Sequence, residues 1–533
     1  MNYNFLLAKK HKAYGIEPKY KEWIDYANHN MINRQKWNFY VCDTKGVKFK
    51  ETVTEQVLKE AYSFCAEKNI SVSKKDAGSY VFATGHQSVF YHPGIWLKNF
   101  LINEYSKNEN ITGLNIWLDY EEGCHEEFAA PYYLSGKYGK KNIPFNVPVC
   151  HNVAAALPPP TDNLWTNFTL DVKNTIKTIP GEKIINNFEN YLLSAKKSIA
   201  SSGNLAEFIA LSRRYYEEES GKARNYLELP VSRILKTTSY LTFVMDIIIK
   251  IDGFCLIYNH VLDTYRAEHM IKNNANPFPN LRIHDDLFEL PFWVIMPSGL
   301  RAGLWYDKGE NTLLAKGEKI ITLDKNTGKN IEILKESGYK IVFKAVTLMM
   351  YFRTFASDFF LHGSGGAKYD IITDQIIQKF YNITPPVYGA ATANLYLDMP
   401  GINYNEKEKF ETEKKLIQIK HNPQNFISDE DKLENPEIKE LIKEKEHLVK
   451  KIKDIPLDDK KIIADRIKEV NLKLEKMVAP LKKELEEKFE VLSRKEAEHR
   501  ISIFREYPFC FYSPDDMEDL IKTITGDRHK PVP

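Results

Sequence analysis

The sequence is poor in cysteine, has almost no net charge and contains no long apolar run free of both charges and prolines. Its six cysteines stand singly, without a CxxC pair, which argues against a zinc ribbon or a disulfide framework and predicts a reducing, cytoplasmic location. The 74 basic residues are balanced by 72 acidic ones, so no overall field attracts nucleic acid or a membrane surface. The longest segment without a charged side chain, residues 142–161, contains five prolines and cannot span a membrane as a helix.

Common catalytic signatures are also missing. The sequence has no HExxH and no GxSxG motif, so the metalloprotease and serine-hydrolase classes lack support, and we predict no metal site.

The 533 residues are 43% hydrophobic, which supplies enough apolar material for several domains. Changes of pattern along the chain predict six segments. They are an N-terminal packing element (1–78), the first part of a core (79–160), a helical and mixed connecting region (161–345), the second part of the core with a glycine-rich loop (346–400), a helical coiled-coil arm (401–500) and a segment that returns to the main body (501–533).

Residues 79–118 have the pattern of a strand, a helix and a second strand. Ser79–Ala83 is a short apolar run, a helical pattern starts near Pro93, and Leu114–Leu118 is another strand-like run. Such a βαβ unit builds a parallel sheet, and ligands bind at the carboxyl ends of its strands. The predicted fold class is therefore α/β.

The first predicted strand ends in the turn-like sequence Thr-Gly-His-Gln at residues 84–87, and His92 precedes the proline that begins the helix. Free backbone N–H groups at a helix N-terminus attract phosphate or carboxylate. We therefore expect an anion site here, with His86 as a candidate catalytic base; the alternative is a turn whose polar groups only cap the helix. The anion-binding candidates are Thr84, Gly85, Gln87, His92 and Lys98.

The second predicted strand runs into an acidic segment at residues 119–127, with five carboxylates and one histidine. Carboxylates at this edge of a sheet suit general-base catalysis or the binding of an amine. We expect Asp119, Glu122 and His125 to be catalytic, in that order. The alternative is an ordinary acidic loop.

A glycine-rich loop at residues 362–370 follows a third strand-like run. It is neither a Walker A motif nor GxGxxG, because Lys368 does not fit either pattern. Its three glycines let the backbone approach a ligand closely, and a lysine in the first helical turn opposes the helix dipole unless an anion is present. The ligand-binding candidates are His362, Gly363, Gly365, Gly366, Lys368 and Asp370. We expect Gly85 and Gly365 to face one shared crevice.

Two further groups are weaker candidates. Arg266 shares a helical face with Tyr258 and Tyr265 and can reach a substrate carboxylate, although core packing explains the same spacing. The run Glu289–Trp293, together with Arg301, is a candidate pocket wall.

Residues 431–500 repeat apolar residues at alternating spacings of three and four among lysines and glutamates. The repeat covers residues 438–455, with Lys445 filling one apolar position, and starts again over 463–485. This predicts a C-terminal antiparallel coiled-coil hairpin whose second arm bends at Pro480. Such arms usually serve oligomerisation, so we expect a homodimer; the alternative is a solvated single helix.

Taken in order, these segments resemble the bacillithiol-biosynthesis cysteine-adding enzymes, a family of cysteine ligases, and the chain is similar to a divergent member. The family has a Thr-Gly-Gln-Gln strand end, matched by residues 84–87, and an aromatic Gly/Pro helix start, matched by 92–96. Its Trp-containing strand and acidic loop are matched by 117–125, its Gly-Gly loop and Pro-Pro segment by 365–386, and its coiled coil by 431–500.

The resemblance implies a Rossmann-like core with helical connecting domains and a dimerising coiled coil. It also implies a ligase-like enzyme that condenses an amino acid, cysteine in that family, with the amine of a small sugar conjugate carrying an anionic group. The cofactor is left open, with ATP or ADP as candidates. His86 stands where the family has glutamine, and His362 and Lys368 also depart from its pattern.

Two other functions fit the residues. Paired histidines between a strand and a helix are similar to the motif of nucleotidyltransferases, which activate a carboxylate with ATP. A non-catalytic, dimeric assembly protein would use the coiled coil to recruit partners.

Overall fold

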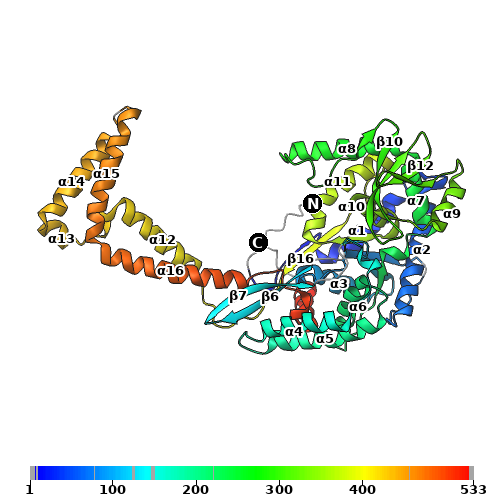
Figure 1. Ribbon diagram of the computed structural model, residues 1–533, viewed down its shortest axis with the longest axis horizontal. Helices are drawn as coiled ribbons and strands as arrows, with labels where there is room; N and C mark the ends of the chain where they lie inside the picture. The colour runs from blue at the N-terminus through cyan, green and yellow to red at the C-terminus, as the bar shows by residue number, and fades with distance from the viewer. Residues whose placement is uncertain are drawn as a thin grey trace. The chain divides into compact units, whose positions relative to one another are not determined.

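The computed structural model describes residues 7, 10–76, 78–122, 126–145, 151–219, 221–454 and 456–526. The chain forms two compact units, whose elements are labelled in Figure 1. The first consists of Met1–Tyr133, Lys140–Asp398 and Phe504–Pro533, and the second of Leu134–Gly139 and Met399–Ile503. The chain thus leaves the first unit after Asp398 and returns to it at Phe504.

A six-stranded sheet lies in the first unit, in the order β1-β16-β15-β4-β5-β8. Its strands are β1 (Ala13–Glu17), β4 (Tyr80–Gln87), β5 (Ile111–Leu118), β8 (Tyr226–Pro230), β15 (Phe359–His362) and β16 (Gly389–Asn394). All neighbours pair in parallel except β1, which runs antiparallel to β16 at the edge. A mainly parallel sheet joined by helices confirms the predicted α/β class.

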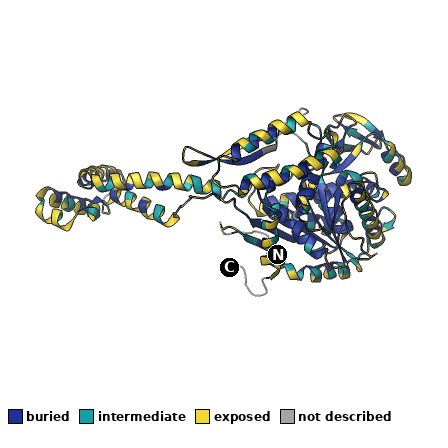
Figure 2. Cartoon of the chain, turned by 90° about the horizontal axis from the view of Figure 1, so that it is seen from below, coloured by how far each residue is buried: buried dark blue, intermediate teal, exposed yellow. Residues whose placement is uncertain are grey.

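The central strands are buried on both faces, as a parallel sheet covered by helices requires. Every residue of β5 from Ile111 to Trp117 is buried, and so are Val81 to Thr84 of β4. Figure 2 shows this burial in dark blue, with exposed faces of the surrounding helices in yellow. The apolar runs at these positions are therefore core strands.

β4 is longer than the sequence pattern predicted. The apolar run indicated a strand end at Ala83, but the backbone pairs with β5 as far as Gln87, opposite Leu118. Polar residues continue the strand because its end lies beside a cavity rather than in the core. Thr84 and Gly85 are consequently strand residues, and the turn begins after Gln87.

Helices cover the sheet and connect its strands. α3 leads from β4 to β5 and packs against both strands and β16, α11 leads from β15 to β16, and α2 packs against β8. The helices of the first unit are α1 (Trp23–Arg34), α2 (Gly46–Glu67), α3 (Pro93–Tyr105), α4 (Asp162–Ile176), α5 (Lys183–Ser201), α6 (Leu205–Glu218), α7 (Thr238–Ile249), α8 (Ile251–Glu268), α9 (Thr327–Glu336), α10 (Ala345–Tyr351), α11 (Ser364–Tyr381) and α17 (Pro514–Gly526).

A second, antiparallel sheet lies within the connecting region, in the order β13-β12-β11-β10-β14, with β9 beside β10. Its strands are β9 (Ile283–His284), β10 (Leu287–Ile295), β11 (Arg301–Asp307), β12 (Thr312–Ala315), β13 (Glu318–Thr322) and β14 (Lys340–Phe343). Two short hairpins complete the strands: β2 (Tyr40–Val41) with β3 (Thr44–Lys45), and β6 (Glu126–Leu134) with β7 (Lys137–Phe145). The second sheet places β10 and β14 next to α10, which follows β14 directly.

The segment that returns from the second unit packs on the loop after β4. Phe509 N donates to Tyr91 O at 2.9 Å, and its ring contacts the rings of Phe90, Tyr91 and Trp96. Phe511 extends the same aromatic cluster to Phe128. The loop after β4 is therefore held by residues from the far end of the chain.

The second unit is helical: α12 (Glu406–His421), α13 (Asp429–Glu434), α14 (Pro436–Lys451), α15 (Leu457–Met477) and α16 (Ala479–Ser502). α14 packs against α15, and α12 packs against α16. Lys445 sits in the apolar interior, as its place in the repeat indicates, and its Nζ donates to His421 O at 2.6 Å and Gln424 Oε1 at 2.8 Å. α12 adds Ile419 to this core, which the two-armed sequence pattern did not include.

Candidate functional site

The ends of β4 and β15 meet at one cavity. The two strands are parallel neighbours, with Leu361 opposite Thr84. After β4 the chain moves to β5 on one side, and after β15 it moves to β16 on the other, so the strand order reverses between them. Ligands of α/β sheets bind outside the carboxyl ends of the strands at such a reversal. A cavity of about 490 Å³ lies there.

Residues from both predicted glycine-bearing segments line this cavity. They are Gly85, His86 and Gln87 at the end of β4, and His362, Gly365, Gly366 and Asp370 at the end of β15 and in α11. Gly85 and Gly365 thus face one crevice, as the sequence predicted. Gly85 has a steric reason as well, because a Cβ at this position would lie 2.7 Å from the carbonyl oxygen of Ile116 in β5.

One wall of the cavity is apolar and aromatic. Its residues are Phe278, Trp293, Phe343, Leu348, Met349, Phe352, Phe360 and Tyr369. Only Trp293 was expected to line a pocket, because the others have the spacing of ordinary core residues. The Lys344 ammonium and the Arg301 guanidinium lie over the Trp293 ring, at 4.7 and 5.3 Å from its centroid. Lys344 also pairs with Glu289 at 2.7 Å, so the indole is held between paired cations.

His362, the last residue of β15, belongs to a buried charged network. Its Nε2 lies 2.8 Å from Asp370 Oδ2. Arg353 donates to the same oxygen at 2.6 Å and to Asp374 Oδ1 at 2.5 Å. Asp370 and Asp374 share one face of α11 because they are four residues apart. Burial raises the pKa of Asp370, but the charge of Arg353, assisted by the His362 and Thr373 side chains, outweighs burial and holds that pKa at about 2.

The His362 ring has one nitrogen toward the carboxylate and one toward a glycine. Burial lowers the pKa of His362, although Asp370 opposes the shift, so the ring is neutral at pH 7. Nε2 is close to the carboxylate but not aligned for a hydrogen bond with it; because the negative charge favours a proton on the nearer nitrogen, we infer that Nε2 carries the proton and that Nδ1 is the acceptor. A Cβ on Gly366 would lie 3.1 Å from Nδ1, so the glycine leaves room there. An oriented imidazole of this kind suits a general base.

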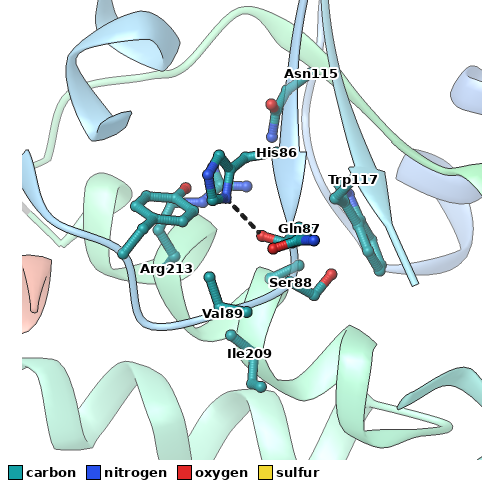
Figure 3. A pocket seen from close by; sticks show the side chains of 10 residues that line it. His86, Gln87, Ser88, Val89, Asn115, Trp117, Ile209 and Arg213 are labelled. Carbon is teal, nitrogen blue, oxygen red and sulfur yellow. Dashed lines mark hydrogen bonds between the residues drawn. The ribbon is translucent and has the colours of Figure 1, made fainter. Parts of the chain in front are cut away.

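His86 lines the cavity and also a small adjoining pocket, shown in Figure 3 with Asn115, Trp117 and Arg213. Its Nδ1 lies 3.2 Å from Gln87 O, the contact drawn as a dashed line in Figure 3. Burial, assisted by the charge of Lys98, lowers the pKa of His86 to about 3. Proton transfer is most efficient when the pKa of the base lies near the working pH. His86 therefore suits hydrogen bonding better than the role of catalytic base.

Lys98 is buried on α3, behind the end of β4. Its Nζ donates to Gly85 O at 2.6 Å. Burial lowers the pKa of Lys98 to about 7, and no carboxylate among the described residues is close enough to raise it. Lys98 does not line the cavity, so its direct effect is to fix the carbonyl of Gly85.

Two more residues predicted to bind an anion are used inside the fold. Thr84 is fully buried, and its Oγ1 donates to Leu361 O at 2.7 Å, which ties β4 to β15. His92 is the N-cap of α3: its Nδ1 accepts from Gly94 N at 3.0 Å, and burial lowers its pKa to about 3. Neither residue lines the cavity. For His92 the alternative prediction, that the polar groups of this turn only cap the helix, is confirmed.

The acidic segment contributes Glu121 to the cavity wall, where it pairs with Arg301 at 2.7 Å. Sequence reasoning preferred Asp119, which is buried away from the cavity. Asp119 Oδ1 accepts the backbone N–H of Ser232 at 3.1 Å, and burial raises the pKa of Asp119 to about 6. Strand β5 ends at Leu118, so its alternation does not extend to these residues; as i and i+2 they would share one side of a continued strand, and they differ because the chain bends after β5.

The other predicted residues lie outside the cavity wall. Glu122 is exposed and 4.0 Å from Arg301, and His125 lies outside the described residues. Gly363 is the N-cap of α11, and Lys368 is exposed. Arg266 binds three backbone carbonyls between residues 274 and 278, so it orders the loop that carries Phe278 rather than a ligand.

A larger groove of about 930 Å³ lies along α2, at the opposite ends of the strands. Its floor contains Asp358, which pairs with Arg34 at 2.8 Å and Lys50 at 3.2 Å. One carboxylate thus serves two cations, and these three side chains are already paired inside the fold. The smaller cavity is the candidate functional site because it lies at the carboxyl ends of the strands, where the strand order reverses.

Among the described residues, no cluster of histidine, cysteine and carboxylate side chains has the geometry of a metal site, and no helix has the length and apolarity to cross a membrane. No protein-family model and no curated protein matches the chain.

Proposed function

We propose that the chain is a ligase-like enzyme with a Rossmann-like core, which joins the carboxyl group of an amino acid to the amine of a small sugar conjugate. Cysteine is the amino acid in the family that the sequence resembles. The observation that carries the proposal is the cavity at the strand reversal, where two glycine-bearing strand ends meet two neutral imidazoles.

The size and polarity of the cavity support a small, partly polar substrate. About 490 Å³ is within the usual range of small-molecule sites. The aromatic wall suits the apolar face of a sugar ring, and the polar lining residues Gln87, Glu121 and Thr373 suit its hydroxyl groups.

Amide formation needs an activated carboxyl group, and we assign its activation to a nucleoside triphosphate that is consumed. The amine nitrogen attacks the activated acyl carbon, the C–N bond forms, the bond to the leaving phosphate oxygen breaks, and the amine proton goes to a base. Backbone N–H groups in the first turn of α11, at Gly365 and Gly366, suit a phosphate or carboxylate group. The Gln87 amide can donate to the oxyanion.

The coiled coil and the homodimer belong to the same proposal. Packing of α14 against α15, with Ile438, Leu441 and Leu448 buried between helices, supports a coiled-coil hairpin. The first unit contains the whole cavity wall, so a dimer formed by the arm would leave catalysis to each first unit.

The test is direct detection of the product. The purified chain is incubated with ATP, L-cysteine and glucosaminyl-malate, and mass spectrometry looks for the cysteinyl amide, whose mass is the sum of the two substrates less water. We expect product with the wild type and with Lys379→Ala, an exposed control on α11. His362→Gln should lose at least ~100-fold in rate, the lower range of general-base catalysis. No product, with no thermal shift by any reactant, would overturn the proposal.

A further inference from the structure

One oxygen of Asp370 lacks a partner. Oδ2 is in contact with both Arg353 and His362, whereas the buried Oδ1 has no donor in hydrogen-bond geometry among the described residues, and Thr373 only assists in lowering the pKa of the carboxyl group. Asp370 is only 2% exposed, and it lines the cavity. A buried acceptor left without a donor costs stability and calls for an explanation. A donor supplied by a ligand in the cavity is such an explanation.

The surroundings of Asp370 favour a cationic donor. Arg353 is shared between Asp370 and Asp374, so these three groups hold one more negative than positive charge when both carboxylates are ionised. Burial raises the pKa of Asp374, however, and burial lowers the pKa of Lys98 to about 7, which leaves that cation only partly charged at neutral pH. Lys98 is the other cation that acts on His362, and the Tyr388 ring packs against both His362 and the Arg353 guanidinium. The cluster therefore attracts a positively charged group to the cavity wall.

We propose that Asp370 binds the primary ammonium group of the substrate through Oδ1, and that His362 accepts the proton which this group loses. The inference rests on the proposed function and deepens it, because it assigns the amine of the sugar conjugate to the α11 end of the cavity. Arg353 is a positioning residue, since it holds Asp370 and does not itself line the cavity.

The step conserves atoms and charge. The ammonium proton moves to His362 Nδ1, the nitrogen next to Gly366, and the electron pair that it leaves makes the amine nucleophilic. The imidazole becomes an imidazolium, whose positive charge lies 2.8 Å from Asp370 Oδ2. No oxidant, reductant or metal is required.

The first experiment compares D-glucosamine with D-glucose, a pair that differs only in an amine or a hydroxyl at one carbon. Both are titrated into the full chain and followed by NMR shift changes. A charge-assisted hydrogen bond should make glucosamine bind roughly tenfold more tightly or better. Asp370→Asn should reduce the preference to within about twofold, whereas the matched Asp374→Asn, which removes the same charge but leaves His362 and Asp370 in contact, should keep the larger part of it.

The second experiment reads the proton on His362 in protein labelled with ¹⁵N-histidine, with His362→Gln used for assignment. We expect a neutral ring protonated on Nε2 at pH 7 in the free protein. A ring protonated on Nδ1, or equal binding of the two sugars by the wild type, would overturn the inference. The comparison of the two sugars uses the wild type alone, so it does not depend on a variant that has to fold.

These outcomes separate the inference from the proposed function. Condensation without a preference for glucosamine would leave the ligase proposal standing and remove the amine site. A preference for glucosamine that depends on Asp370, without condensation, would support the amine site and remove the ligase proposal.

Discussion

Replacement of Lys98 by methionine should stabilise the protein at pH 7 and destabilise it above pH 10. The Lys98 ammonium is buried, and among the described residues only the Gly85 carbonyl oxygen is bound to it. Burial lowers its pKa from 10.5 to about 7 in the folded chain. Between these two pH values the unfolded chain binds the extra proton, so stability rises with pH across that window.

The magnitude follows from the two pKa values. Each pH unit between them is worth about 1.4 kcal/mol, so keeping Lys98 in the folded chain at pH 7 costs roughly 4 kcal/mol. Methionine removes that cost but leaves Gly85 O without its donor, which costs about 1–2 kcal/mol. The net gain expected at pH 7 is about 2–3 kcal/mol. Above pH 10 only the lost hydrogen bond remains, and the sign reverses.

Urea unfolding of both chains at several pH values between 6 and 10.5 measures this difference, because other titrating groups cancel between them. Lys50→Met is the matched control: Lys50 is equally buried but lies 3.2 Å from Asp358, so its loss should destabilise the protein by ~1–3 kcal/mol at pH 7. A Lys98→Met difference that is negative at pH 7, or independent of pH, would refute the reasoning that this amine lacks a counter-charge.

Four other outcomes are expected. Gly366→Ala should hold or raise the unfolding temperature, because alanine favours the helix. The added methyl group should also slow the acylation of His362 Nδ1 by diethyl pyrocarbonate, measured by peptide mass spectrometry. An unchanged acylation rate would contradict an accessible Nδ1. Gly85→Ala should lower the free energy of unfolding by ~2 kcal/mol or more, since its Cβ would meet the backbone of β5 at 2.7 Å. Asp119→Asn should stabilise the protein by ~2–3 kcal/mol at pH 7 and by little at pH 4. Burial raises the pKa of Asp119 to about 6, so the free energy of unfolding of the wild type falls as pH rises from 4 to 6 and the carboxyl group ionises. Equal effects at both pH values would exclude a buried charge. If the arm forms the expected homodimer, glutamate at both Phe410 and Ile417, which are 65% and 53% exposed on one face of α12, should produce monomers in light scattering, and a wild-type monomer would remove that expectation.

The α/β class and the place of the cavity could be predicted from local patterns. Apolar runs at residues 80–83 and 114–118 are continuous because parallel strands are buried on both faces. The glycines at 85 and 365–366 marked the two segments that meet, and the close backbone of β5 requires a glycine at position 85. The sequence pattern did not predict which polar side chains line the cavity. Asp119 is buried and Glu121 lines the cavity because the chain bends after β5, and the run of acidic residues gives no sign of that bend.

Residues that act through long-range contacts were missed altogether. Arg353 pairs with Asp370 and Asp374, which are 17 and 21 positions further along the chain, and no motif surrounds it. Two carboxylates four residues apart on one helix face need a cation when they are buried. The spacing of Asp370 and Asp374 could therefore have suggested an arginine or lysine partner from elsewhere in the chain. The aromatic wall had no such signal, because its members look like core residues in sequence.

The contact between Phe509 and the loop after β4 has a consequence for the order in which the protein is made. Phe509 N binds Tyr91 O, and the strand end with His86 lies immediately before that loop. Residue 509 is translated about 420 positions after β4. A nascent chain therefore contains His86 long before Phe509, which holds the loop after β4, has been made. Binding competence should therefore appear late in synthesis, and a chain cut before this aromatic residue should keep its sheet but lose the ordered approach to the cavity.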